Sequence, residues 1–234
     1  MNKYRTIGII GGQGPVSTAD IYMRIIKYYQ DKLGVRYIRD YPPIIIYSVP
    51  TPDLVKSVED EKTTYLAVAK VTRQLEKDGA DFIIIACNSL QFLIDKLQSL
   101  VKIPIVGIVP IVSAYVNKTG YKTVGLLASD TVIKREVYGK HLNNFGIKVI
   151  LPDQSDQIVA EEIMLNEIGG KSGVEDKRKL KGIISNLQTA GAETVLLACT
   201  ELPLVIKQKD VEIPLIDCNE LYAIEAAKLS SKIQ

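Results

Sequence analysis

Short runs of aliphatic residues alternate along this chain with longer segments in which apolar residues recur every three or four positions. Continuous Ile, Val and Leu runs without polar alternation are typical of strands that are covered on both faces. We expect such strands at residues 5–10, 43–48, 82–86, 105–107, 123–128, 148–151, 194–198 and 215–216. The longer segments predict amphipathic helices, at residues 17–32, 59–78, 90–100, 111–118, 132–144, 157–167, 174–190 and 220–232. Strands that alternate with helices indicate an α/β fold with parallel sheets.

The two halves of the chain repeat one another. GADFIIIACNSL at residues 79–90 matches GAETVLLACTEL at residues 191–202, and each copy carries a cysteine at the same offset. The match extends to two further pairs of segments, TIGII with TVGLL and KIPIV with EIPLI. We therefore predict two similar parallel-sheet α/β domains related by pseudo-twofold symmetry, with the active site between them. The first comprises residues 1–114 and a returning C-terminal helix at 217–234, and the second comprises residues 115–216.

Composition excludes several classes of protein. Acidic and basic residues are interspersed and leave a net charge of +2, which gives no basic stripe for nucleic acid. The longest apolar run, about residues 103–116, is too short to span a bilayer. The N-terminal residues lead straight into a predicted strand rather than a signal peptide. Three cysteines fit a reduced protein better than a disulfide framework. We expect a cytoplasmic protein without a nucleic-acid or membrane partner.

Both repeated segments place a cysteine at the carboxyl end of a strand, which is the edge where open parallel sheets bind ligands. Polar side chains follow, in Cys87-Asn88-Ser89 and in Cys199-Thr200-Glu201. A single cysteine in such a place is often only a small hydrophobic residue. Two in matched positions before helix starts favour a function, because helix N-termini attract anions and stabilise thiolates. Two thiols on opposite sides of one carbon could invert its configuration by proton transfer.

A glycine-rich loop, Gly11-Gly12-Gln13-Gly14-Pro15, follows the first predicted strand. It lacks the third glycine of a dinucleotide fingerprint, since Ser17 stands there, and the second strand ends at Ser48 without an acidic residue. The third glycine and the acidic residue are both parts of the dinucleotide-binding motif. The loop is better interpreted as a backbone cradle for a small anion.

The remaining chemically active residues favour no other reaction. Cys218 ends a strand but has no counterpart in the first half, where Gly107 stands, so we predict a packing role. His141 is the only histidine and lies on a polar helical segment. The cysteines lack the paired spacing of a zinc site, so we expect no metal. One histidine on a solvated segment also disfavours Ser-His-Asp catalysis.

Three motifs resemble those of the aspartate/glutamate racemase family, and most closely the cofactor-independent aspartate racemases. They are GGQGP at residues 11–15 (family GGxGP), CNS at 87–89 (family CNT) and CTELP at 199–203. The segment at residues 124–131 is similar to the family's GLLAT-x-GT stretch. The resemblance covers essentially the whole chain, and it implies that no cofactor is used and that the protein is a homodimer.

The resemblance implies that Cys87 and Cys199 interconvert L- and D-aspartate, one as base and the other as acid. Glu201 would hold the α-amino group of the substrate or only cap its helix. The residues expected to bind substrate lie in the glycine loop, at strand ends and on one lysine, namely Gly12, Gln13, Gly14, Ser48, Asn88, Ser89, Thr131, Lys171, Thr200 and Glu201.

The chain departs from the family motifs at three places. Gln91 stands where the family's CNTAH has histidine, and DCNELYA at 217–223 replaces DTTxLHA. Leu54 follows Pro-Asp where some aspartate racemases have an arginine, which leaves Arg39 and Lys171 as candidates to hold a side-chain carboxylate. A glutamate or broad-specificity racemase therefore stays open, as does isomerisation of an unsaturated diacid, as in maleate isomerase. A non-catalytic anion binder is disfavoured because both cysteines are intact.

Overall fold

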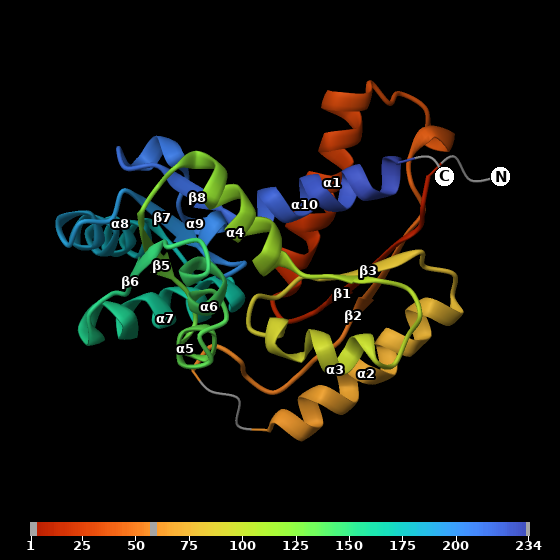
Figure 1. Ribbon diagram of the computed structural model, residues 1–234, viewed down its shortest axis with the longest axis horizontal. Helices are drawn as coiled ribbons and strands as arrows, with labels where there is room; N and C mark the ends of the chain where they lie inside the picture. The colour runs from red at the N-terminus through yellow and green to blue at the C-terminus, as the bar shows by residue number, and fades with distance from the viewer. Residues whose placement is uncertain (1–3, 57–59, 233–234) are drawn as a thin grey trace. The chain divides into compact units, whose positions relative to one another are not determined.

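A computed structural model describes residues 4–56 and 60–232 (Figure 1). It contains two parallel four-stranded sheets with the orders β2-β1-β3-β4 and β6-β5-β7-β8. The strands are β1 (Ile7–Gly11), β2 (Ile44–Ser48), β3 (Phe82–Ile85), β4 (Ile105–Val106), β5 (Thr123–Leu127), β6 (Lys148–Ile150), β7 (Thr194–Leu197) and β8 (Leu215–Asp217). The predicted α/β fold with two similar parallel sheets is confirmed.

Helices connect the strands throughout the described chain. The α-helices are α1 (Pro15–Leu33), α2 (Glu61–Lys77), α3 (Ile94–Gln98), α4 (Ile108–Thr119), α5 (Asp130–Lys134), α6 (Gly139–Asn143), α7 (Gln154–Ile168), α8 (Val174–Thr189), α9 (Leu202–Val205) and α10 (Cys218–Ser231). Short 3₁₀ turns are η1 (Ile38–Asp40), η2 (Gln91–Leu93) and η3 (Gln208–Asp210). Glu59, the predicted start of one helix, lies outside the described residues.

The described chain divides into two compact units. The first contains residues 4–52, 60–108 and 219–232, and the second contains residues 53–56 and 109–218. The sequence-based boundary after residue 114 falls inside helix α4, whose residues belong to the second unit from Val109 onward.

Burial explains the aliphatic runs in the sequence. Every residue of β1, β3 and β7 is buried, whereas Ile46 in the edge strand β2 is exposed. Figure 1 shows α1 and α10 on one face of the first sheet and α2 and α3 on the other. In the second unit, α8 packs against β5 and β7. The central strands are thus covered on both faces, as the unbroken apolar runs predict.

In each sheet, a glutamine side chain forms hydrogen bonds to the backbone at the start of the last strand, which is β4 in the first sheet and β8 in the second. Gln98 Nε2 donates to the carbonyl of Ile103 (3.0 Å), and Gln98 Oε1 accepts from the amide of Ile105 in β4 (2.7 Å). Gln208 makes the corresponding bonds five and seven residues further along, at 3.1 and 2.8 Å, the second to β8. The internal repeat therefore extends to side-chain geometry that the two sequences do not display as a motif.

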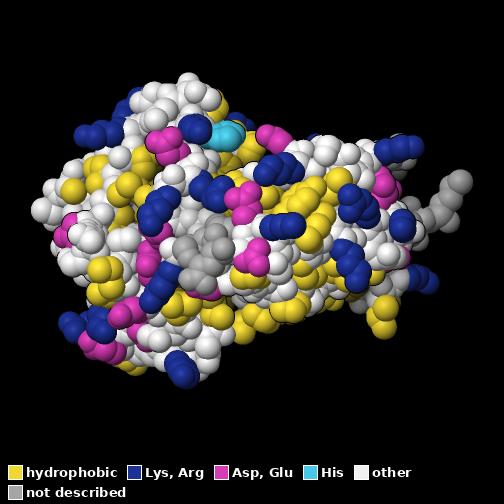
Figure 2. All heavy atoms as spheres, turned by 90° about the horizontal axis from the view of Figure 1, so that it is seen from below, with side chains coloured by type: hydrophobic (Ala, Val, Ile, Leu, Met, Phe, Trp, Pro, Cys, Tyr) yellow, Lys and Arg dark blue, Asp and Glu magenta, His cyan; other side chains and the backbone are white. Residues whose placement is uncertain are grey.

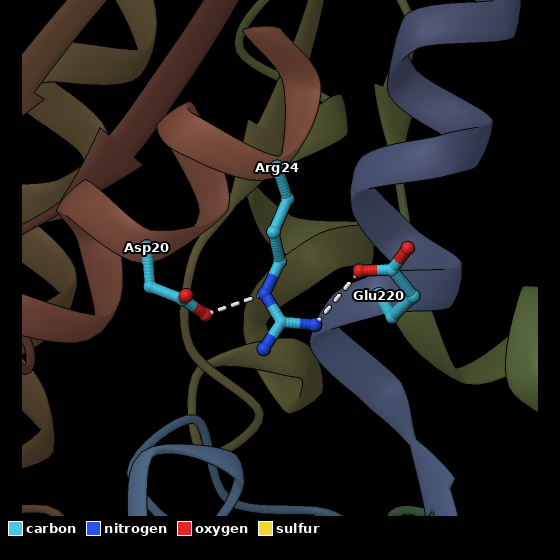
Figure 3. A network of polar contacts seen from close by, with 3 residues as sticks. All are labelled: Asp20, Arg24 and Glu220. Carbon is cyan, nitrogen blue, oxygen red and sulfur yellow. Dashed lines mark hydrogen bonds and ion pairs between the residues drawn. The ribbon is translucent and has the colours of Figure 1, made fainter. Parts of the chain in front are cut away.

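Helix α10 packs on the first unit through polar contacts as well as apolar ones. Arg24 of α1 donates to Asp20 (2.6 Å) and to Glu220 of α10 (2.9 Å) (Figure 3). The Glu220 side chain is half exposed, so this pair contributes at most about 1 kcal/mol. The buried Tyr222 hydroxyl accepts from the amide of Ile85 (2.9 Å) and donates to the carbonyl of Val106. Because the Tyr222 side chain and the amide of Ile85 are buried, their bond holds α10 more strongly than the half-exposed ion pair does.

Two predicted helices are interrupted. The segment 132–144 forms α5 and α6, because Glu136 adopts a left-handed conformation (φ 51°). Around it, Val137 N donates to Val132 O and Glu136 N to Ile133 O, which is the hydrogen-bond pattern of a Schellman helix end. The segment 90–100 forms the turn η2 followed by α3. Apolar periodicity continues through both breaks, so it could not reveal them.

Candidate active site

Cys87 lies at the edge of the first sheet where β1 opens into the glycine-rich loop. It follows β3, which pairs with β1, and the preceding Ala86 donates its amide to Ile10 O (2.8 Å). The side chain is 6% exposed. Topology therefore places Cys87 at the same sheet edge as the Gly12–Gly14 loop, the edge where parallel sheets bind ligands.

The glycine-rich loop is held by its own contacts. Gly12 has φ 99°, and a Cβ atom there would lie 2.4 Å from the amide nitrogen of Val49, so only glycine fits. The Gly12 amide donates to Thr18 Oγ1 (3.1 Å), and Gln13 Nε2 donates to Val49 O (2.7 Å). Among the described residues, Gln13 Oε1 is buried without a hydrogen-bond partner. Gln13 therefore has an acceptor to offer a ligand.

Gln91 and Tyr222 support the strand end that carries Cys87. Gln91 Nε2 donates to Cys87 O (3.0 Å), and its Oε1 accepts from the amide of Ile108 (2.9 Å). Gln91 also hydrogen-bonds the Tyr222 hydroxyl, and burial raises the pKa of Tyr222 well above its usual value. The hydroxyl stays protonated and can donate to Val106. The two positions where the chain departs from the family's histidines are thus in contact with each other.

Cys199 occupies the equivalent place in the second sheet. It follows β7, which pairs with β5, and the preceding Ala198 donates its amide to Leu127 O (2.8 Å). The side chain is 7% exposed. The strand, the backbone bond and the burial all match those of Cys87, so the sequence repeat corresponds to a repeat of position in the fold.

The carboxylate of Glu201 is in direct contact with the Cys199 thiol. Cys199 Sγ donates to Glu201 Oε2 (3.0 Å), and Thr200 Oγ1 donates to the same oxygen (2.9 Å). Glu201 is 3% exposed. It precedes α9 in the N-cap position, but its side chain accepts no hydrogen bond from that helix. The helix-capping alternative for Glu201 is therefore wrong, because its carboxylate turns to its own strand end.

The other predicted residues lie in varied surroundings. Thr131 is buried, and its hydroxyl has no hydrogen-bond partner within the part of the chain that the structure describes. Ser48 is exposed at the end of β2, and Lys171 is exposed in the loop between α7 and α8. Leu54 is buried. Arg39 lies in η1, before β2 begins, and so at the edge of the first sheet opposite to Cys87. The prediction that Arg39 holds a substrate carboxylate is therefore wrong for a substrate beside Cys87 of the same unit.

Gln157 was missed by the sequence analysis. Its Nε2 donates to Ala128 O at the end of β5 (3.1 Å) and to Glu161 Oε1 (2.8 Å). Its Oε1 is buried without a partner among the described residues. A glutamine on a helix carries no sequence signal for such a place, since only the fold brings α7 to this strand end.

Cys218 and His141 have the surroundings of structural residues. Cys218 is fully buried beside Tyr138, and burial raises the pKa of its thiol, which keeps it protonated. His141 is exposed, and Figure 2 shows it in cyan among side chains of both charges.

Within residues 4–56 and 60–232, no three His, Cys, Asp or Glu side chains are grouped so that they could hold a metal ion. None of the described helices is both long and apolar enough to cross a membrane.

Comparison with known proteins identifies the family to which this chain belongs. The model of the Asp/Glu/Hydantoin racemase family matches residues 10–226. The chain belongs to this family. The broad specificity amino-acid racemase RacX of Bacillus subtilis is 29% identical over 217 residues, which cover 93% of this chain and 94% of RacX. The family assignment makes the chain a racemase, and therefore an isomerase.

Solved structures of the family share the fold. An aspartate racemase homologue from Pyrococcus horikoshii is 30% identical, with a TM-score of 0.81 over 97% of this chain and 100% of that chain. The aspartate racemase of Picrophilus torridus has a TM-score of 0.83 at 23% identity, over 96% of this chain and 94% of that chain. A glutamate racemase from Francisella tularensis has a TM-score of 0.70 at 22% identity, over 97% of this chain and 80% of that chain. The family resemblance expected from the three motifs is confirmed.

Proposed function

We propose that this racemase interconverts L- and D-aspartate by proton transfer between Cys87 and Cys199, without a cofactor. The observation that carries the proposal is the matched placement of the two thiols. Each follows the strand beside the central Gly-containing strand of its sheet, each is preceded by the same backbone bond, and the exposures are 6% and 7%. A packing role would not require this equivalence in two units, whereas a two-base reaction does.

In the proposed reaction one cysteine is a thiolate and the other a thiol. The thiolate takes the α-hydrogen as a proton and leaves the C–H electron pair on the substrate, delocalised toward its carboxylate. The thiol gives its proton to the opposite face of the carbon and becomes the thiolate, so the total of protons is unchanged. The proposal requires that both thiols reach one substrate molecule. Asn88, Ser89 and Thr200, beside the cysteines, would stabilise the developing negative charge.

Two observations bear on the substrate. The Pyrococcus horikoshii protein, 30% identical, is described as an aspartate racemase homologue, which supports aspartate. RacX is described as a broad specificity enzyme, and the buried Leu54 stands where the motif of some aspartate racemases has arginine. A broad-specificity racemase is therefore the second candidate function.

The substrate can be tested by chiral analysis after incubation with single amino acids, including glutamate, and with maleate. If aspartate is preferred through Lys171, Lys171→Ala should raise KM for aspartate by roughly tenfold or more, because a hydrogen bond to a charged group contributes about 1.5–3 kcal/mol. Proton exchange on alanine should not change. Lys181→Ala, an exposed lysine on α8, is the matched control. Similar kcat/KM values for aspartate, glutamate and neutral amino acids would contradict a preference for aspartate and support a broad-specificity racemase.

The absence of a cofactor gives a separate prediction. Two thiols suffice for proton transfer, so activity should survive dialysis against a chelator, and the purified protein should show no visible absorbance from pyridoxal phosphate. The measurement is racemisation before and after dialysis, with and without added pyridoxal phosphate. Activity that returns only with pyridoxal phosphate or a metal would contradict the two-thiol reaction. The homodimer and the cytoplasmic location stay predictions from the resemblance and the composition.

A further inference from the structure

We propose that one apolar face of the first unit packs against the same face of a second copy of this chain, so that the protein is a twofold dimer. We call this surface the β2 face. It is formed by one side of α1, the turn η1 and the edge strand β2, namely Tyr22, Met23, Ile26, Tyr37, Ile38, Tyr41, Pro42, Ile44 and Ile46. All these residues belong to the first unit. The proposal goes beyond the proposed function and does not depend on it.

The strand β2 is a sheet edge without the usual protection. It pairs with β1 on one side and with no other strand among the described residues (Figure 1). Its five residues, Ile44–Ser48, include three isoleucines, no charged residue and no proline, and none of the five is buried. Natural proteins protect exposed edges with lysine, proline or very short strands. An apolar edge that lacks these features is therefore expected to be covered by another chain.

The other sheet edges of the described chain have such protection. The strand β6, which corresponds to β2 in the second sheet, begins with the exposed Lys148 and has three residues. The opposite edges, β4 and β8, have two and three residues. Of the four edge strands that the structure describes, β2 is thus the longest and carries no charge.

An exposed apolar side chain stands beside an apolar groove on this face. Ile38 in η1 is 94% exposed, the largest exposed fraction among the large hydrophobic side chains that the structure describes. The groove between α1 and the start of β2 has a volume of about 390 Å³, and its lining residues are Tyr22, Ile26, Ile38, Tyr41, Pro42 and Ile44. Met23, next to Tyr22 on α1, is also more than half exposed. Burial of these side chains would favour association.

A second copy fits this face because the face is complementary to itself. In a twofold interface both subunits use the same surface, so a side chain of one copy meets a different part of that surface on the other. Ile38 and the groove lie side by side, so each copy can place its isoleucine in the groove of the other. A small apolar ligand could fill the groove but would leave Ile38 exposed.

The charges of η1 are complementary in the same way. Arg39 and Asp40 follow Ile38, and neither side chain has an ion-pair partner within the part of the chain that the structure describes. Two copies of the turn related by a perpendicular twofold axis run in opposite directions, so Arg39 of each copy can pair with Asp40 of the other. Such pairs at the rim of an interface set orientation more than affinity.

The test measures the mass of the full-length protein by sedimentation equilibrium over a wide range of concentrations. We expect the wild type to be a dimer. Ile38→Asp should raise the Kd of the dimer by roughly thirtyfold or more, because it places a charge in an apolar groove at the centre of the interface. Since Ile38 is almost fully exposed, the substitution removes few contacts within the folded chain.

Val174→Asp is the matched control. Val174 begins α8 in the second unit and is 88% exposed, so the substitution adds the same charge outside the β2 face. It should leave the Kd unchanged. Hydrogen exchange then locates the contact. The amides of η1 and β2 should exchange faster in Ile38→Asp than in the wild type at the same concentration, whereas those of β6 should not change.

A wild-type protein that is monomeric at every concentration would overturn the proposal, whatever else covers the β2 face. A dimer that Ile38→Asp leaves as stable as the wild type, or that Val174→Asp weakens equally, would also overturn it. Racemisation is measured separately. An active enzyme that stays monomeric would keep the proposed function and remove the dimer, and an inactive protein that dimerises through the β2 face would do the reverse.

Discussion

Cys87→Ser and Cys199→Ser should each lower kcat for racemisation roughly a hundred- to ten-thousand-fold, which is the usual contribution of a positioned general acid or base. A serine hydroxyl keeps almost the size of the thiol but does not ionise near neutral pH, so it can neither take nor give the α-proton. The measurement is the initial rate from each enantiomer by chiral chromatography, at saturating substrate.

Cys218→Ser is the matched control, since the same substitution is made in the third cysteine. Its thiol is fully buried and its pKa is raised by burial, so activity should persist even if the protein is less stable. Exchange of the substrate α-hydrogen with deuterium from solvent is a second measurement on these variants. If Cys87→Ser or Cys199→Ser still exchanges the α-hydrogen of one enantiomer without inverting it, the remaining cysteine acts alone. Full racemisation by Cys87→Ser would exclude the two-thiol mechanism.

Tyr222→Phe should lower the free energy of unfolding by about 1–3 kcal/mol for each buried backbone group that loses its partner. The hydroxyl bonds two backbone groups, the buried amide of Ile85 and the partly buried carbonyl of Val106. Urea unfolding measures the change. Tyr29→Phe is the control, because Tyr29 is equally buried but bonds only one backbone group that is described, Ala227 O of the same helix α10 (3.3 Å), besides the Ser230 side chain. Tyr29→Phe should lower the free energy of unfolding by less than Tyr222→Phe does.

Tyr222→Phe should also lower kcat more than it raises KM, because Ile85 precedes Cys87 by two residues in the strand end that Tyr222 and Gln91 hold. Tyr29→Phe should not change kcat. Equal losses of stability in the two variants, with kcat unchanged in both, would show that Tyr222 does not position the strand end.

Local sequence pattern was sufficient for the parts of the structure that depend on neighbouring residues. Aliphatic runs located the strands of the described residues to within two residues, and the repeat placed Cys87 and Cys199 at equivalent strand ends. Strand burial and helix amphipathicity are properties of short segments, so they can be recognised without the fold.

The features that sequence could not show depend on long-range contacts or on one torsion angle. Gln91 and Tyr222 are separated by more than half of the chain, and nothing in either segment indicates that they meet. The direction of the Glu201 side chain decides between holding a thiol and capping α9, and sequence does not encode that choice visibly. Arg39 is a different case, because a residue that precedes a predicted parallel strand lies at its amino end, so the sequence pattern was already sufficient to exclude it beside Cys87.

The path of the chain through the two units has a consequence during biosynthesis. The second unit ends at residue 218, whereas the first still needs residues 219–232, which form most of α10. A ribosome therefore adds every residue of the second unit to the growing chain before it adds Tyr222. Until the last helix emerges, the strand end that carries Cys87 lacks the hydroxyl that bonds Ile85. The half of the enzyme that is begun first is thus the half that is finished last.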